Sequence, residues 1–231
     1  MERNATSGTA IGTEGEGPSG GRRRLTPTRT LAATFVAVLL LLLCTYWFLA
    51  GDHRIDRILS FGLPDPSGAS GHRGYWSSAA WLFTALGSVE VVFVLASALV
   101  LFLLLAGRLK DAVTTVVVIA GGAAAGYAAK FVTGYFRPHH SPGSTEMLNT
   151  SFPSGHALLA TLLVGTAAVL TARSAASPTA KASVWTAAIF LAGSVGLSRI
   201  YLGTHWPSDV LAGWTFGILW LAATERSIGR L

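Results

Sequence analysis

Six polar residues stand where the sequence predicts the ends of apolar helices, and their types suit joint chemistry. They are three cations, two histidines and one carboxylate: Lys130, Arg137, Arg199, His156, His205 and Asp209. Cations without a matching cluster of acids favour an anionic substrate, and two histidines favour acid–base or nucleophilic catalysis. An ionisable side chain in a membrane span is a functional-site candidate, because the bilayer makes it costly. These residue types therefore predict a site for an anion.

The first of three segments that carry these residues runs from Lys130 to Arg137-Pro138. Lys130 and Arg137 are seven residues apart, which is about two helical turns and places them on one face of a helix. Both are expected at the outward end of their span. A lysine near the end of a span also often extends its ammonium to the interface and does nothing more. Taken alone, Lys130 fits either interpretation.

The second segment, Phe-Pro-Ser-Gly-His at 152–156, is a tight turn that leads into an apolar helix. Backbone N–H groups at a helix start lack partners and lie at the positive end of the dipole, which suits phosphate. Gly155 lets a ligand approach the backbone closely. Ser154 either caps the helix, binds phosphate or does both. His156, taken alone, is an interfacial histidine or a catalyst.

The third segment runs from Ser198-Arg199 to Asp209. His205 and Asp209 are four residues apart, so the carboxylate can reach the imidazole across one helical turn. A carboxylate on one ring nitrogen fixes the tautomer and leaves the other nitrogen to attack. The alternative is an ordinary helix start, with Asp209 favoured in the first turn by the helix dipole.

Long apolar stretches must position these segments. Hydrophobic residues make up 51% of the 231 residues and charged residues 12%, against about 25% charged in soluble domains. The uncharged run 31–50 is long enough to cross the hydrocarbon core as a helix. Five further spans are expected, at about 76 or 81 to 106, 112–136, 156–172, 184–202 and 208–223. The predicted fold is all-α, a polytopic membrane protein with a six-transmembrane-helix bundle.

The expected domain organisation is a disordered cytoplasmic tail over 1–28, a six-span domain over 29–226 and a short cytoplasmic C-terminus over 227–231. Eleven of the seventeen Lys and Arg residues fall on the side of the termini. This bias predicts cytoplasmic termini and a site on the extracytoplasmic face of the plasma membrane. It also accounts for the net charge of +6 without nucleic acid. The single cysteine, Cys44, excludes a disulfide framework and a multi-cysteine zinc site.

Together the three segments resemble the three-part signature of the type 2 phosphatidic acid phosphatase family, related to vanadium haloperoxidases and bacterial class A acid phosphatases. Eleven residues carry the match: Lys130, Arg137, Pro138, Pro153, Ser154, Gly155, His156, Ser198, Arg199, His205 and Asp209. The resemblance implies that His205 attacks phosphorus to form a phosphohistidine, supported by Asp209, while His156 moves protons. It further implies that a set of cations, a hydroxyl and a backbone N–H hold the phosphoryl oxygens: Lys130, Arg137, Arg199, Ser154 and Gly155.

The resemblance implies a lipid phosphatase within the bilayer. The expected substrate is phosphatidic acid, phosphatidylglycerol phosphate or undecaprenyl diphosphate. No cofactor or metal is expected, because the sequence lacks a carboxylate cluster to bind one. His139, His140 and Glu146 in the outward loop are expected to tune headgroup choice. The sequence leaves the oligomeric state undefined.

Three alternatives remain open at the level of sequence. The first is a lipid phosphotransferase that passes the phosphoryl group to an alcohol. The second is a haloperoxidase, which membrane embedding disfavours. The third is a non-catalytic lipid transporter or binding protein, which the intact His156, His205 and Asp209 disfavour.

Overall fold

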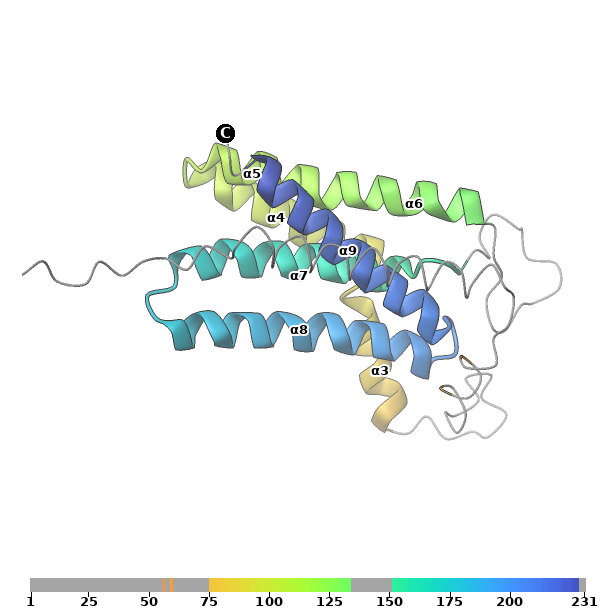
Figure 1. Ribbon diagram of the computed structural model, residues 1–231. Coiled ribbons are helices and arrows are strands. Elements are labelled where there is room, and N and C mark those ends of the chain that lie inside the picture. The colour runs from red at the N-terminus through yellow and green to blue at the C-terminus, as the bar shows by residue number, and fades with distance from the viewer. Residues whose placement is uncertain (1–55, 57–58, 60–74, 134–150, 229–231) are drawn as a thin grey trace, which may run out of the picture.

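The computed structural model describes residues 56, 59, 75–133 and 151–228. Its helices are α3 (Tyr75–Ala85), α4 (Val89–Leu105), α5 (Leu109–Val116), the π-helical turn η1 (Val117–Gly121), α6 (Gly122–Thr133), α7 (Gly155–Ser174), α8 (Pro178–Tyr201) and α9 (Pro207–Ile228) (Figure 1). This part of the chain contains no strand, so the all-α prediction is confirmed for it. The predicted tail at 1–28 and the predicted first span at 31–50 lie outside the described residues.

Three described helical segments are long and apolar enough to cross a membrane: Leu109–Phe131, Gly155–Ser174 and Pro178–Tyr201. The bent pair of α3 and α4 adds a fourth if both helices belong to one span. Helix α9 is not among them. The six-span count therefore stays a prediction.

The expected second span, from residue 76 or 81 to 106, is not one unbroken helix, because the chain breaks between α3 and α4. The two helices meet at an angle of 49°. Ser88 begins α4 as its N-cap and accepts a hydrogen bond from the Val91 N–H at 3.3 Å, with Glu90 in the first turn. Both residues favour a helix start. Gly87 lies against α7, where an added Cβ would be 2.8 Å from the His156 carbonyl oxygen.

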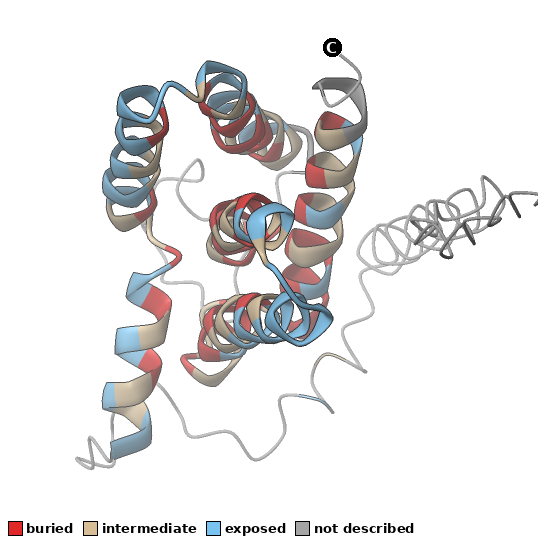
Figure 2. Cartoon of the chain, turned by 90° about the vertical axis from the view of Figure 1, so that its left-hand side faces the viewer, coloured by how far each residue is buried: buried red, intermediate tan, exposed pale blue. Residues whose placement is uncertain are grey.

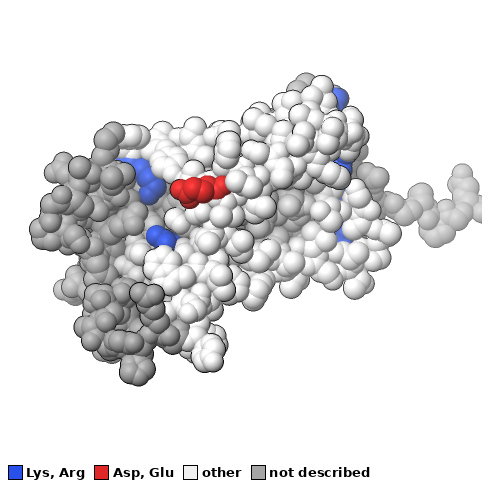
Figure 3. Space-filling view, turned by 180° about the vertical axis from the view of Figure 1, so that it is seen from behind, with Lys and Arg blue, Asp and Glu red and all other residues white. Residues whose placement is uncertain are grey.

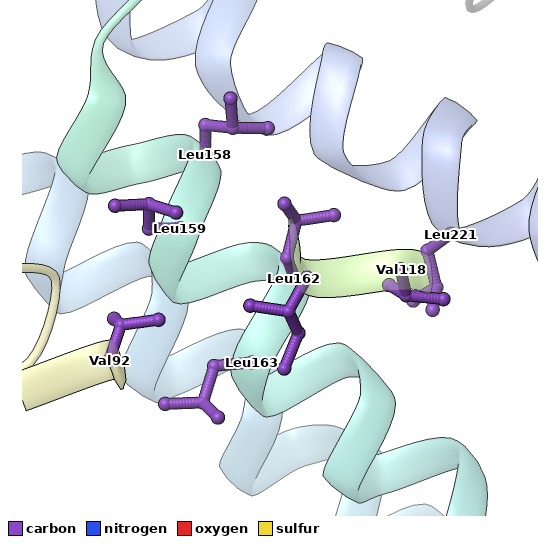
Figure 4. Close-up of a cluster of buried hydrophobic side chains, with 8 residues drawn as sticks. Val92, Val118, Leu158, Leu159, Leu162, Leu163 and Leu221 are labelled. Atoms are coloured by element: carbon purple, nitrogen blue, oxygen red, sulfur yellow. The ribbon is translucent and has the colours of Figure 1, made fainter. Parts of the chain in front are cut away.

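Helix α7 is the centre of the bundle. It contacts α4, η1, α6, α8 and α9, most extensively α8 and α9, and it is buried along most of its length (Figure 2). Its leucines form the main core cluster with residues of α4, η1 and α9 (Figure 4): Leu158, Leu159, Leu162 and Leu163 pack with Val92, Val118, Ile119 and Leu221. The outer helices keep many large apolar side chains exposed, as lipid contact requires.

Glycines let the neighbouring helices approach α7 closely, as small residues do in membrane bundles. A Cβ at Gly122 of α6 would lie 2.6 Å from a methyl group of Leu162. A Cβ at Gly213 of α9 would lie 2.6 Å from the Ser154 carbonyl oxygen. Gly122 belongs to a run of small residues at 121–126, a composition that suits close helix packing.

Charged side chains tie the helices together at the end of the bundle away from the α8–α9 turn. Asp111 of α5 pairs with Arg108 at 2.9 Å and with Arg173 of α7 at 3.1 Å, and Arg173 also pairs with Glu225 of α9. On the face shown in Figure 3, basic side chains lie toward the two ends and acidic ones lie beside them at one end. The surface between is almost entirely uncharged.

Candidate active site

The C-terminal end of α6, the start of α7 and the α8–α9 turn lie at the same end of the molecule (Figure 1). The turn itself is built around one carbonyl. The Arg199 carbonyl oxygen accepts hydrogen bonds from the Thr204 N–H at 3.1 Å, the His205 N–H at 3.3 Å and the Thr204 hydroxyl at 3.0 Å. Gly203 closes helix α8 with φ of 62°, a conformation that favours glycine. These bonds fix the backbone of His205 against that of Arg199.

His205 and Asp209 form a buried pair at the start of α9. The His205 side chain is 2% exposed and that of Asp209 is 1% exposed, with Nδ1 3.4 Å from Oδ2. The same Oδ2 accepts a hydrogen bond from the Trp206 N–H at 3.0 Å. Asp209 is thereby anchored while it faces Nδ1. A partner at Nδ1 orients the imidazole and leaves Nε2 as the reactive nitrogen.

The start of α7 is joined to this pair by a backbone hydrogen bond. The Ser154 N–H donates to the Asp209 carbonyl oxygen at 2.9 Å. Ser154 occupies the N-cap position of α7, but its hydroxyl makes no capping hydrogen bond. The Ser154 Oγ is fully buried and has no hydrogen-bond partner among the described residues. The interpretation of Ser154 as only a cap is therefore wrong, and its hydroxyl suits a ligand at the α7 N-terminus.

The two helix starts at the site differ in charge. Helix α9 has two carboxylates at its start, because Asp209 lies in its first turn and Asp56 accepts hydrogen bonds from Ser208. Asp56 receives the Ser208 N–H at 3.0 Å and the Ser208 hydroxyl at 2.7 Å. Helix α7 has no acidic residue in its first turn. An anion is therefore favoured at the α7 end rather than at the α9 end.

Lys130 reaches the start of α7 from α6. Its Cε lies 3.8 Å from the position that a Cβ would take at Gly155. Both residues line a hollow between α6 and α7, together with Ala123, Gly126, Tyr127, Pro153, Leu158 and Leu159. The Lys130 side chain therefore lies beside the start of α7, and its role in the site stays a prediction.

Of the remaining predicted site residues, the structure describes Arg199 and His156 but not Arg137. Arg199 is buried in α8, and its Nη1 donates a hydrogen bond to the Thr84 hydroxyl of α3 at 2.9 Å. His156 is partly buried in the first turn of α7. Arg137 lies outside the described residues, as do the predicted headgroup residues His139, His140 and Glu146.

Two contributors to the site, Asp56 and Thr84, are absent from the sequence prediction. Asp56 is one of several charged residues in a polar loop, and no local pattern distinguishes it. Thr84 is a lone polar residue in an apolar stretch. The Gly87-Ser88 pair and Glu90 that follow it are a helix-start pattern, which could have revealed the break that brings Thr84 to the site.

The described residues contain no group of three or more His, Cys, Asp or Glu side chains placed to hold a metal ion. Lys130 lies beside the α7 start, and Arg199 is buried in α8, where it bonds to Thr84 of α3. The structure thus places a lysine beside the start of α7, and a backbone hydrogen bond joins the same helix start to the buried imidazole–carboxylate pair.

The fold of the chain is similar to that of a solved transmembrane protein. The structure superposes on the crystal structure of a transmembrane PAP2 type phosphatidylglycerolphosphate phosphatase from Bacillus subtilis with a TM-score of 0.68. The match covers 84% of this chain and 96% of the other, at 23% identity. The two proteins thus share a fold, that of a helical membrane protein.

Sequence comparison then gives the family. The chain is 34% identical over 127 residues to an undecaprenyl-diphosphatase of Sulfolobus acidocaldarius, a match that covers 52% of this chain and 57% of that relative. The chain thus spans little more than half the length of this curated relative. A profile of the PAP2 superfamily matches residues 111–230. The chain belongs to the PAP2 superfamily, which confirms the resemblance seen in its motifs.

Proposed function

We propose that the protein is an integral membrane lipid phosphatase that works through a phosphohistidine intermediate without a metal. Membership of the PAP2 superfamily and the names of its two relatives support a lipid phosphatase. One structural observation carries the mechanism. The buried His205–Asp209 pair is joined by the Ser154–Asp209 hydrogen bond to a helix start that favours an anion.

In the first step, Nε2 of His205 attacks phosphorus, so that an N–P bond forms and the bond from phosphorus to the leaving oxygen breaks. His156 donates a proton to that oxygen. Asp209, at 3.4 Å from Nδ1, stabilises the positive charge that develops on the imidazole. Its second hydrogen bond, from the Trp206 N–H, holds the carboxylate in place.

In the second step, His156 takes a proton from water, the water oxygen attacks phosphorus and the N–P bond breaks. This step releases inorganic phosphate and neutral His205; the lipid alcohol, or the lipid monophosphate of a diphosphate substrate, has already left in the first step. Charge on the phosphoryl oxygens is stabilised by Lys130, Arg137, Arg199, the Ser154 hydroxyl and the Gly155 N–H. Positioned cations and N–H donors supply most of the catalysis in phosphoryl transfer.

The substrate we propose is a lipid phosphate whose apolar chains stay in the bilayer. Undecaprenyl diphosphate and phosphatidylglycerol phosphate are the candidates that the two relatives suggest, and phosphatidic acid shares their chemistry. Because both termini are predicted in the cytoplasm, the site is proposed to open on the extracytoplasmic face of the plasma membrane.

The experiment is a phosphate-release assay on the detergent-solubilised protein with these three lipids and a soluble phosphate ester. We expect release from at least one lipid, and His205→Asn should abolish it. Wild-type turnover in that variant would contradict the mechanism. Transfer of phosphate to an added alcohol in preference to water would instead establish the phosphotransferase alternative.

A further inference from the structure

The buried guanidinium of Arg199 is held by a residue far away in the sequence. Its Nη1 donates to the Thr84 hydroxyl at 2.9 Å, across 115 positions of the chain. Thr84 is 4% exposed and Arg199 is 6% exposed, so water competes little for this contact. A hydrogen bond to a charged group in such surroundings is stronger than one between neutral groups.

Thr84 reaches Arg199 because of the break between α3 and α4. It lies in the last turn of α3, directly before the 49° bend. One turn later, Gly87 packs against two site helices, since a Cβ there would lie 2.6 Å from Val195 of α8 and 2.8 Å from the His156 carbonyl oxygen of α7. The break therefore contacts the helices that carry Arg199 and His156.

We propose that Thr84 is a positioning residue that aims the Arg199 guanidinium at the phosphoryl group, an inference that rests on the proposed function. The Arg199 backbone is fixed by the α8–α9 turn, but an arginine side chain has many rotamers and loses entropy when it is ordered. Thr84 occupies one N–H of Nη1 and restricts those rotamers before the substrate binds. Donors that are already oriented stabilise a transition state without reorganisation.

The experiment compares Thr84→Val, which keeps the shape and removes the hydroxyl, with Thr84→Ser, which keeps the hydroxyl. Thr166→Val is the matched control, because the Thr166 hydroxyl is buried and donates to the Leu162 carbonyl of its own helix. We expect Thr84→Val to lower kcat/KM and to weaken competitive inhibition by inorganic phosphate about tenfold each. Thr84→Ser should restore most of both, and Thr166→Val should behave as wild type.

Thr84→Val is also tested in an Arg199→Lys background, which separates a positioning role of Thr84 from a merely structural one. If Thr84 acts through the guanidinium, Thr84→Val should have an effect of less than about twofold there. An undiminished effect in that background, or equal values for Thr84→Val and Thr166→Val in the wild-type background, would overturn the proposal. If Thr84→Val does not fold, Thr84→Ala takes its place in both backgrounds. Absence of phosphate release from the wild-type protein would contradict the proposed function instead.

Discussion

Replacing Asp209 by Asn tests the charge on which the proposed nucleophile depends. Asn keeps the size of the side chain, and its amide oxygen can still accept the Trp206 N–H hydrogen bond. It loses the negative charge that lies 3.4 Å from His205 Nδ1. Two unit charges at that separation attract by about 5 kcal/mol at an effective dielectric constant of about 20. Since about 1.4 kcal/mol corresponds to a tenfold change in rate, kcat should fall by roughly three to four powers of ten.

The assay is phosphate release under saturating lipid phosphate, with the thermal midpoint measured on the same preparation. Glu225→Gln is the matched control, because it removes a carboxylate at the other end of the same helix, where Glu225 pairs with Arg173. The control should keep wild-type kcat. A decrease of less than tenfold in Asp209→Asn, with its fold intact, would refute the assignment of Asp209 as the residue that supports the charge on His205.

Three further predictions concern packing, capping and metal dependence. Gly213→Ala should lower the free energy of unfolding by about 1–3 kcal/mol, because its Cβ would lie 2.6 Å from the Ser154 carbonyl oxygen. Gly193→Ala should be neutral or slightly stabilising, because its Cβ would meet no packed neighbour within 4 Å among the described residues. Thermal unfolding in detergent measures both. Asp56→Ala should lower the free energy of unfolding by about 1–2 kcal/mol and also lower activity, because it removes both hydrogen bonds to Ser208. An unchanged thermal midpoint and an unchanged rate of phosphate release would contradict the role of Asp56 as a cap of α9. A chelator should leave phosphate release unchanged, and a strong loss that magnesium restores would contradict the metal-independent mechanism.

The motifs could be predicted from the sequence because each depends on short-range geometry. His205 and Asp209 meet across one helical turn, which their spacing of four residues dictates. The start of α7 at Gly155 follows from a proline and a small-residue turn placed before an apolar run. The placement of these segments at one end of the molecule was predictable only because the expected topology puts their helix ends on the same side.

The break between α3 and α4 and the residues that support the site were not predictable in the same way. Apolar composition alone cannot distinguish one helix of about thirty residues from two bent ones, since both satisfy the bilayer equally well. The contacts of Thr84 with Arg199 and of Asp56 with Ser208 join residues 115 and 152 positions apart. Such contacts depend on tertiary packing, which a periodic pattern in the sequence does not record.

The central claim is that His205 becomes covalently phosphorylated, and trapping that intermediate tests it most directly. The protein would be mixed rapidly with a lipid phosphate labelled on phosphorus, quenched in alkaline denaturant and mapped by peptide mass spectrometry. We predict label on the peptide that contains His205, stable in base and lost in acid as a phosphoramidate should be, and absent from His205→Asn. Label on a different residue, or turnover of the wild-type protein with no labelled peptide on the time scale of a single turnover, would contradict the account.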